Sequence, residues 1–225
     1  MTSAVQLSSV IFSYPNSNAV FECNDWTLNH GEHVFLQGPS GSGKSTLLGL
    51  LSGILKPNSG EVCINGTELS RLSQKQRDKF RAQNLGVVFQ QFNLVPYLNT
   101  LENLQLATHF ANSELDIEGH VKPMLEALKL DESVLTQAIS TLSIGQKQRV
   151  AIMRACVNTP KVLLVDEPTS ALDSQAANGF MGLLLDLCKV NQSSLIFVSH
   201  DDSLGSYFER HETLSNIATW SSVDG

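Results

Sequence analysis

The sequence contains no long apolar run. A membrane-spanning helix needs about eighteen or more consecutive apolar residues, and no segment of this 225-residue chain approaches that length. Residues 1–15 also lack the basic flank and apolar stretch of a signal peptide. We therefore expect a soluble protein in which any pore or membrane anchor is supplied by another chain.

Cysteine and positive charge are also scarce. The four cysteines are widely separated and form no Cys-x-x-Cys pair, which indicates neither a zinc site nor a disulfide framework and fits a reducing cytoplasm. The chain has 15 Lys and Arg residues against 22 Asp and Glu residues, for a net charge of -7. Because proteins that bind a nucleic-acid backbone present a basic face, we expect no nucleic-acid partner.

The sequence does contain an alternation of short strand-like segments with helical patterns. Two helical patterns begin at Lys44 and after Asp173, and residues 70–130 are mostly helical and polar apart from a strand at Leu85–Phe89. The first two strand-like segments alternate apolar and polar residues, whereas the later ones are apolar throughout and predict a mainly parallel α/β sheet. The other predicted strands are Val5–Ser13, Ala19–Asn29, His33–Gln37, Glu61–Asn65, Val162–Val165 and Ser194–Ser199.

Residues 38–46, GPSGSGKST, match the pattern GxxxxGK[ST] between a predicted strand and a predicted helix. The glycines allow backbone N–H groups to wrap a phosphate, and the helix N-terminus adds its positive dipole. Lys44 can then reach the β- and γ-phosphates, and the Ser45 hydroxyl can bind Mg²⁺. We predict that nine residues bind the nucleotide: Gly38, Pro39, Ser40, Gly41, Ser42, Gly43, Lys44, Ser45 and Thr46.

Two adjacent acids, Asp166 and Glu167, end the apolar strand 162–165. Alone, such a pair is as typical of a helix cap or a salt bridge as of catalysis. After a phosphate-binding loop, we predict that Asp166 holds Mg²⁺ through its water shell. Glu167 is then placed to orient or deprotonate a water that attacks the γ-phosphate, which indicates hydrolysis.

These motifs resemble the nucleotide-binding domains of ABC transporters. The order and spacing agree from about Val5 to Asn216, including LSIGQ at 142–146, SALD at 170–173 and SHD at 199–201. The segment FQQFNLVPYLNTLENLQL is most similar to the lipoprotein-releasing and macrolide-exporter group. The resemblance implies one ABC ATPase domain over residues 1–225 with a P-loop NTPase fold. Its RecA-like parallel core and N-terminal antiparallel β-subdomain would span about 1–70 and 146–225, and an inserted helical subdomain about 71–145.

The resemblance also assigns roles to single residues outside the loop. Tyr14 takes the position that stacks on adenine, although it could simply pack beside Pro15. Gln90 takes the position that senses Mg²⁺ and the γ-phosphate, but Gln91 is adjacent and the choice rests on alignment. Gln90 is thereby placed among the metal ligands, with Ser45 and Asp166.

Two further roles concern the C-terminal half of the chain. Asp173 takes the position of the D-loop aspartate. His200 takes the position of the switch histidine, which donates a hydrogen bond toward the γ-phosphate, although a histidine at a strand end can be purely structural. The predicted catalytic residues are then Glu167, His200, Gln90 and Lys44.

The segment Leu142, Ser143, Ile144, Gly145 and Gln146 differs from the family signature LSGGQ at one residue, Ile144. The resemblance implies that this signature faces an ATP bound by a second subunit, in a head-to-tail dimer. If its third position requires positive φ, an isoleucine there is strained by about 1 kcal/mol or more. We predict negative φ instead, with the side chain turned away from the nucleotide.

The resemblance implies an ATP- and Mg²⁺-dependent ATPase that powers a separate transmembrane permease, for export or for lipoprotein or lipid extraction. The subunit would lie on the cytoplasmic face of the inner (plasma) membrane through that permease, and would dimerise with ATP. Two alternatives are a soluble ABC ATPase not coupled to transport and a catalytically idle binding module. Residues 70–130 are either a solvated helical face or the surface that docks on the permease. The candidate docking residues, which could equally be ordinary core residues, are Phe92, Leu94, Pro96 and Leu98.

Overall fold

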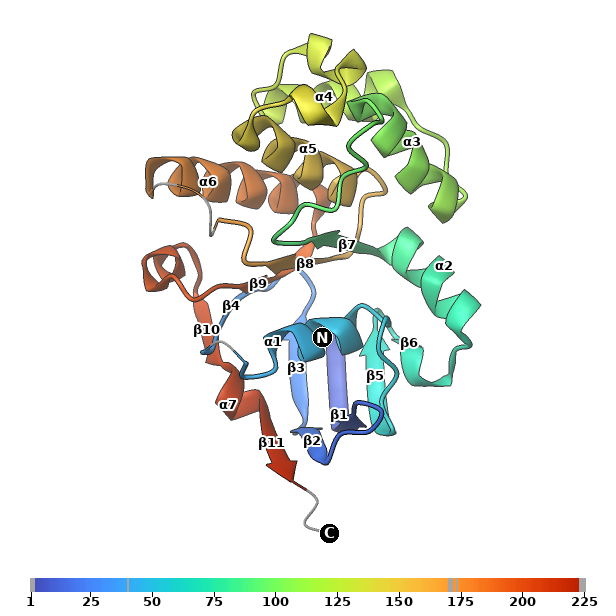
Figure 1. Ribbon diagram of the computed structural model, residues 1–225, viewed down its shortest axis with the longest axis vertical. Helices are drawn as coiled ribbons and strands as arrows, with labels where there is room; N and C mark the ends of the chain where they lie inside the picture. Colours follow the sequence, from blue (N-terminus) through green and yellow to red (C-terminus); the bar gives the residue numbers. More distant parts are fainter. Residues whose placement is uncertain (1–2, 40, 170–171, 173, 223–225) are drawn as a thin grey trace.

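A computed structural model describes residues 3–39, 41–169, 172 and 174–222. An antiparallel sheet, a parallel sheet and a group of helices follow one another along the long axis (Figure 1). The strands are β1 (Ser3–Ser13), β2 (Ala19–Cys23), β3 (Trp26–Asn29), β4 (His33–Gln37), β5 (Ser59–Ile64), β6 (Thr67–Glu68), β7 (Leu85–Val88), β8 (Val162–Asp166), β9 (Ser194–Val198), β10 (Arg210–Thr213) and β11 (Ala218–Ser222). The α-helices are α1 (Lys44–Leu51), α2 (Gln74–Asn84), α3 (Thr100–Ala111), α4 (Lys122–Ala127), α5 (Ile144–Cys156), α6 (Ser174–Asn191) and α7 (Leu214–Ile217).

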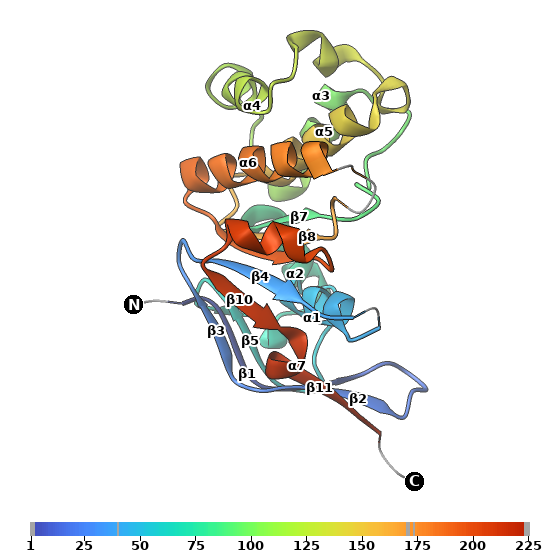
Figure 2. The same ribbon diagram turned by 90° about the vertical axis from the view of Figure 1, so that its left-hand side faces the viewer.

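The parallel sheet has the strand order β10-β4-β9-β8-β7, and every neighbouring pair is parallel. Its central strands are buried on both faces, because helices cover one face and α1 with the antiparallel sheet covers the other (Figures 1 and 2). In β4, Phe35 belongs to the helix-side core, whereas Val34 and Leu36 belong to the core around α1. This two-sided burial explains the continuous apolar runs of the sequence.

The antiparallel sheet has the order β11-β2-β1-β5-β6, with β3 also paired to β1. The prediction of one strand at Ala19–Asn29 is wrong, because the chain is interrupted between β2 and β3. Ser9 adopts a φ of 48° in the middle of β1, and its N–H donates to the Asp25 carboxylate at 3.0 Å. β1 therefore changes partner, pairing with β2 through its C-terminal half and with β3 through its N-terminal half.

The irregularity in β1 also explains one glycine. Gly60, at the start of β5, has a φ of 82°, and a Cβ there would lie 2.2 Å from the carbonyl oxygen of Ser9. β5 can pair with β1 on both sides of Ser9 only because residue 60 lacks a side chain. The register between these strands shifts at this point, between Ser8 and Ile11.

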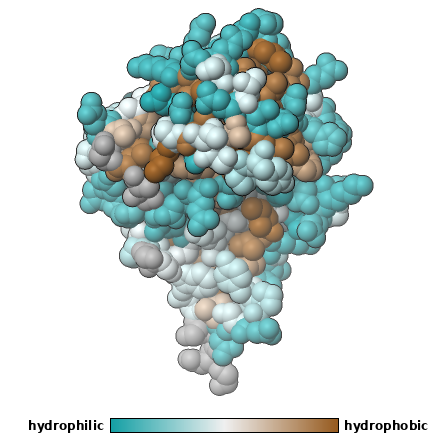
Figure 3. All heavy atoms as spheres, turned by 45° about the horizontal axis from the view of Figure 1, so that its top comes forward, coloured by the Kyte–Doolittle hydropathy of each residue, from teal (hydrophilic) through white to brown (hydrophobic). Residues whose placement is uncertain are grey.

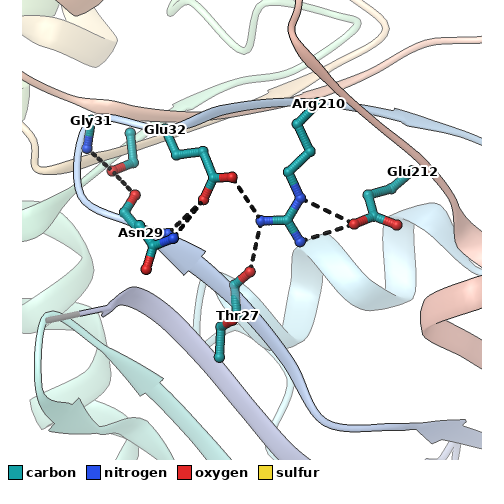
Figure 4. A network of polar contacts seen from close by, with 7 residues as sticks. Thr27, Asn29, Gly31, Glu32, Arg210 and Glu212 are labelled. Carbon is teal, nitrogen blue, oxygen red and sulfur yellow. Dashed lines mark hydrogen bonds and ion pairs between the residues drawn. The ribbon is translucent and has the colours of Figure 1, made fainter. Parts of the chain in front are cut away.

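A polar network at the β3–β4 turn connects the two sheets (Figure 4). The Arg210 guanidinium of β10 donates to the Thr27 carbonyl at 2.8 Å, forms ion pairs with Glu32 and Glu212 at 3.1 and 2.9 Å, and lies 5.3 Å from the centre of the Trp26 ring. One cation thus joins β3 of the antiparallel sheet to β10 at the edge of the parallel sheet.

Helices α3, α4 and α5 form the upper part of the molecule (Figure 1). Their apolar residues, with those of α6, make up the core on the helix side of the parallel sheet. Among the described residues, no helix is both long enough and apolar enough to cross a membrane.

Candidate functional site

The phosphate-binding loop predicted at residues 38–46 connects β4 to α1. Gly41 and Gly43 have φ values of 77° and 107°, a region of backbone space that other residues rarely enter. Lys44 is the first residue of α1, and its buried ammonium group donates to the carbonyl oxygens of Gly38 and Pro39 at 2.7 and 3.0 Å. Ser40 lies outside the described residues. The chain therefore forms a tight loop around the lysine at the start of a helix.

The adjacent acids lie at the C-terminal end of β8, beside this lysine. The Lys44 ammonium is 3.7 Å from a carboxylate oxygen of Glu167. Burial raises the pKa of Asp166, the charge of Glu167 raises it further, and the Lys44 ammonium opposes the rise. Two carboxyl groups that face one ammonium leave this end of the pocket able to accept a further cation.

Glu167 itself has an unusual backbone conformation, with a φ of 44°. Its N–H donates to the Val198 carbonyl at 2.9 Å, which continues the pairing of β8 with β9 beyond the strand end. A left-handed glutamate costs about 1 kcal/mol or more and is typical of positions where function requires it. The turn directs the carboxylate away from β8 toward Lys44 and His200.

His200, which follows β9, contacts the same carboxylate. Its Nδ1 atom lies 3.3 Å from Glu167, and most of the imidazole is exposed. The imidazole therefore lies in the pocket beside Glu167, and it is not a buried histidine whose ring nitrogens bond only within the end of the strand. Lys44, Glu167 and His200 come from three separate elements and meet because the carboxyl ends of parallel strands share one edge of the sheet.

One pocket of about 620 Å³ contains all four predicted catalytic residues and all three predicted metal ligands. Gln90 lines it, whereas Gln91 does not, which favours the first of these two glutamines. Its lining residues are Gly41, Gly43, Lys44, Ser45, Thr46, Gln90, Asp166, Glu167, His200 and Trp220. A larger open groove, of about 1440 Å³, lies among residues such as Lys161, Lys189 and Tyr207, and contains none of the predicted site residues.

Tyr14, which follows β1, lies beside the 620 Å³ pocket, next to the first turn of α1. Its hydroxyl is 3.0 Å from the Thr46 hydroxyl, and its ring meets the Phe12 ring edge-on at 4.8 Å. Phe12 and Phe21 are buried, whereas Tyr14 is 41% exposed. Of these three aromatic rings, Tyr14 has the most surface available to a ligand, and its stacking on adenine stays a prediction.

The predicted signature segment forms the N-terminus of α5. Ser143 is the N-cap, accepting from the Gln146 N–H at 3.2 Å, and the Gln146 side chain accepts from the Ser143 N–H at 2.9 Å. Ile144 is the first helical residue, is not among the residues with positive φ, and has a 57% exposed side chain. The predicted negative φ of Ile144 is confirmed, and the orientation of its side chain away from a nucleotide stays a prediction. Apart from the adjacent residues and the backbone of its own helix, no described atom lies within 4 Å of a Cβ placed on Gly145, so this position is open to an approaching group.

The structure does not bring this segment to the pocket, because none of residues 142–146 lines it. Leu142 is buried and anchors the segment to the helix-side core. Asp173, the predicted D-loop residue, lies outside the described residues. The predicted site residues of one chain therefore lie in two separate places, at the phosphate-binding loop and at the start of α5, which we call the two predicted half-sites.

The predicted docking residues follow Gln90 in the segment between β7 and α3. Phe92 is half-buried with a φ of 57°, and the Arg154 guanidinium of α5 donates to its carbonyl at 2.9 Å. Leu94 packs against the helix-side core, whereas Pro96 is exposed and Leu98 half-buried. The four residues therefore divide between core packing and surface, and their role in docking stays a prediction.

Sequence reasoning missed two residues at the site. Trp220 of β11 lines the pocket and donates its indole N–H to the Ser42 carbonyl at 3.0 Å. Gln148 is buried on α5 and donates to the Pro168 carbonyl at 2.7 Å, just after Glu167. Gln148 lies two residues before the apolar run that starts at Val150, and this nearness to apolar helix positions is the sequence signal that could have indicated a buried amide. Trp220 had no local signal, since its role depends on the pairing of β11 with β2.

Known proteins resemble this chain in both sequence and fold. The family model described as ABC transporter matches residues 22–170. An uncharacterized ABC transporter ATP-binding protein of Methanocaldococcus jannaschii, MJ0796, is 38% identical over 213 residues, covering 92% of this chain and 91% of that protein. The lipoprotein-releasing system ATP-binding protein LolD of Xanthomonas campestris is 40% identical over 192 residues, covering 85% of this chain and 80% of LolD.

Solved structures agree with these matches. A dimeric, post-hydrolysis state of the ATP-binding cassette MJ0796 bound to ADP and Pi has a TM-score of 0.82 and 34% identity, covering 98% of this chain and 99% of that one. The structure of cbiO1 from Clostridium perfringens, part of the cbiONQ ABC transporter complex, has a TM-score of 0.81 and 27% identity, with 95% and 85% covered.

Proposed function

The chain belongs to the ABC transporter family and is an ATP-binding, ATP-hydrolysing transporter subunit, and we propose that it drives a separate permease for export or for lipoprotein or lipid extraction. Similarity to the lipoprotein-releasing protein LolD supports this direction of transport. The observation that carries the catalytic part is the meeting of Lys44, Glu167 and His200 in one pocket with the phosphate-binding loop.

We infer the following roles for these groups. Lys44 bonds to the carbonyls of its own loop, and a β- or γ-phosphate would take over its ammonium donors. Glu167 would accept a proton from the attacking water, and its backbone turn fixes the carboxylate for that step. His200, which contacts Glu167 in this structure, would donate a hydrogen bond to the γ-phosphate. Tyr14 would carry the adenine.

The residues fit a divalent cation as well. Asp166 and Glu167 place two carboxyl groups opposite one ammonium, and Ser45 and Gln90 line the same pocket. A Mg²⁺ bound with ATP would neutralise phosphate charge during transfer. Ser45, Gln90 and Asp166 are the residues that would hold it, with Asp166 acting through water.

The separation of the half-sites supports a head-to-tail dimer formed with ATP. The Ser143 hydroxyl and the Gly145 backbone N–H lie at an exposed helix N-terminus, which suits a phosphate held by a second subunit. Each chain carries a net charge of -7, so without nucleotide the two subunits repel each other. We therefore propose a monomer in the absence of nucleotide and a dimer with two ATP molecules between the chains. Asp173 would belong to the same interface.

The helical part would dock on the permease at the cytoplasmic face of the inner (plasma) membrane. Apolar patches interrupt the polar surface of the upper part of the molecule (Figure 3). Tyr97 and Phe110 are 81% and 64% exposed there, and Leu106 and Ile117 are also exposed. Apolar surface of this kind is typical of interaction sites. We propose residues 71–145 as the helical subdomain that provides it.

A phosphate-release assay combined with size-exclusion chromatography tests the proposal. We expect slow ATP hydrolysis by the isolated chain, and a dimer when Glu167→Gln protein is given ATP and Mg²⁺. A wild-type chain that binds no ATP, or a Glu167→Gln variant that hydrolyses ATP like the wild type, would contradict it.

A further inference from the structure

Trp220 is an aromatic residue in the nucleotide pocket that comes from the C-terminal end of the described chain. On β11 it lies opposite Phe21 of β2, and the two rings meet edge-on with centres 5.3 Å apart. A Cβ on Gly43 would lie 2.7 Å from the indole nitrogen and 2.8 Å from the Phe21 ring. The two rings therefore support the phosphate-binding loop directly behind Gly43.

The indole N–H also determines the direction of one peptide group. It donates to the Ser42 carbonyl at 3.0 Å, and the described chain contains no cis peptide bond. In a trans peptide the C=O and the following N–H point in opposite directions. Because Trp220 draws the Ser42 oxygen toward itself, the N–H of Gly43 points away from Trp220, to the other side of the loop.

This peptide needs an external restraint, since its neighbours do not fix it. Gly41 and Gly43 lie on either side of Ser42, at φ values of 77° and 107°, and glycine permits rotation of the adjoining peptide at little cost. Backbone N–H groups in such a loop are the ligands of a bound phosphate. A rotated Ser42–Gly43 peptide would present a carbonyl oxygen to the phosphate and repel it.

We propose that Trp220 is a positioning residue for the phosphate-binding loop, which holds the Ser42–Gly43 peptide with the Gly43 N–H directed at the nucleotide phosphates. This inference rests on the proposed ATP site. It makes the C-terminal strand a determinant of nucleotide affinity, through the triphosphate rather than through the base. At saturating ATP the bound phosphate itself holds the peptide, so the rate of the chemical step is unaffected.

The test compares Trp220→Phe, which retains an aromatic ring but lacks the N–H donor, with Trp220→Ala and with Thr219→Ala. Thr219 is the exposed preceding residue of β11, and its variant controls for changes to the strand. The dissociation constants of ATP and of inorganic tripolyphosphate are measured by calorimetry, and KM and kcat by phosphate release.

We expect Trp220→Phe to weaken both ligands by about tenfold, the size of one hydrogen bond that orients a binding group. KM should rise by a similar factor while kcat stays within about twofold of wild type. Trp220→Ala should weaken the binding of both ligands further. Thr219→Ala should match the wild type in all measurements.

Three results would overturn the proposal. The first is a loss with ATP but none with tripolyphosphate, which would indicate that the indole contacts the base. The second is an unchanged dissociation constant for both ligands in Trp220→Phe. The third is a lower melting temperature and kcat with unchanged KM, which would indicate a structural role alone. If the wild type bound neither ligand, the proposed ATP site itself would be wrong.

A second measurement does not depend on the folding of Trp220 variants. The chain has two tryptophans, so Trp26→Phe leaves Trp220 as the sole tryptophan, which is excited selectively at wavelengths that tyrosine does not absorb. Tripolyphosphate should change its emission with a half-saturation point equal to the calorimetric dissociation constant. Emission that does not respond while calorimetry reports binding would contradict the proposal.

Discussion

The two half-sites of this chain are constructed by different means. The half-site at the phosphate-binding loop joins groups from separate elements, with Glu167 lying 3.7 Å from Lys44 and 3.3 Å from His200. The half-site at α5 is local, because the Ser143 cap and its Gln146 partner are only three residues apart. The first therefore depends on the completed parallel sheet, and the second on one turn of helix.

The two predicted half-sites also differ in how accessible their phosphate-binding groups are. The loop half-site contains charged groups that already pair with one another, and a phosphate must displace those pairs. The predicted α5 half-site presents an exposed helix N-terminus in which, apart from its own turn, no described atom lies within 4 Å of a Cβ placed on Gly145. Substitutions at the first should therefore alter chemistry directly, whereas substitutions at the second should alter local stability and, through the contact with a second chain's nucleotide, turnover.

The largest effect is expected from Glu167→Gln, which disables the loop half-site and leaves the α5 half-site unchanged. Loss of a general base should lower turnover by at least about 10²-fold, while ATP binding persists and an ATP-dependent dimer accumulates. Phosphate release and size-exclusion chromatography measure both, with exposed Glu209→Gln as the matched control. Residual turnover above about one hundredth of wild type would be incompatible with Glu167 as the base.

Ser143→Ala tests the predicted α5 half-site, and Ser73→Ala is a matched control. Ser73 caps α2 through the same Ser-x-x-Gln arrangement, with Gln76 as its partner. Loss of either cap should lower the free energy of unfolding by about 1 kcal/mol. Only Ser143→Ala should also lower turnover, by about tenfold, because it removes a predicted phosphate ligand. Urea unfolding and ATPase rates separate the two, and equal turnover in both variants would refute a role for Ser143 beyond capping.

Gln148→Leu tests the contact that connects α5 to the turn after Glu167. The buried amide donates to the Pro168 carbonyl, and a leucine leaves that carbonyl without its donor at a cost of about 1–3 kcal/mol in unfolding free energy. We expect turnover to fall about fivefold, equivalent to about 1 kcal/mol in the barrier. Exposed Gln105→Leu is the control. Wild-type stability and turnover in Gln148→Leu would show that the contact is dispensable.

The smallest effect is expected from Ile144→Gly, which restores the family signature. Since Ile144 is exposed and lacks positive φ, turnover should stay within about threefold of wild type, and glycine should lower the unfolding free energy by several tenths to about 1 kcal/mol. Melting temperature and ATPase rate are the measurements. A tenfold or larger gain in the isolated subunit's ATPase would show that isoleucine weakens this half-site.

The features predicted correctly from the sequence depend on short spacings. The glycines and Lys44 lie within one loop, and the apolar strand before Asp166 is continuous, so local patterns suffice. The conformation of Ile144 was predictable for the same reason, since a helix cap involves neighbouring residues. The resemblance supplied what local patterns alone lacked, namely the expectation of a dimer and of a separate permease, which stays a prediction for this chain.

The features missed depend on contacts between distant segments. The interruption between β2 and β3 follows from the Ser9–Asp25 bond, which no pattern of alternation reveals. The strands β10 and β11 were not predicted, because four or five residues at a sheet edge have little periodicity. The role of Trp220 required knowing that β11 lies beside β2, across nearly the whole chain.

The Arg210 network has a consequence for how the chain folds during synthesis. Arg210 bonds to Thr27 across 183 positions, and contacts this distant in sequence form slowly because a long loop must close. As the ribosome releases the chain from its N-terminus, β4 and β2 lack their strand partners β10 and β11 until those segments emerge, and Thr27 of β3 lacks its bond to Arg210. A nascent chain that already contains the phosphate-binding loop but not yet β10 and β11 therefore lacks both the Arg210 link and Trp220 and, on the proposed role of Trp220, should hold a nucleotide less tightly until β11 has paired with β2.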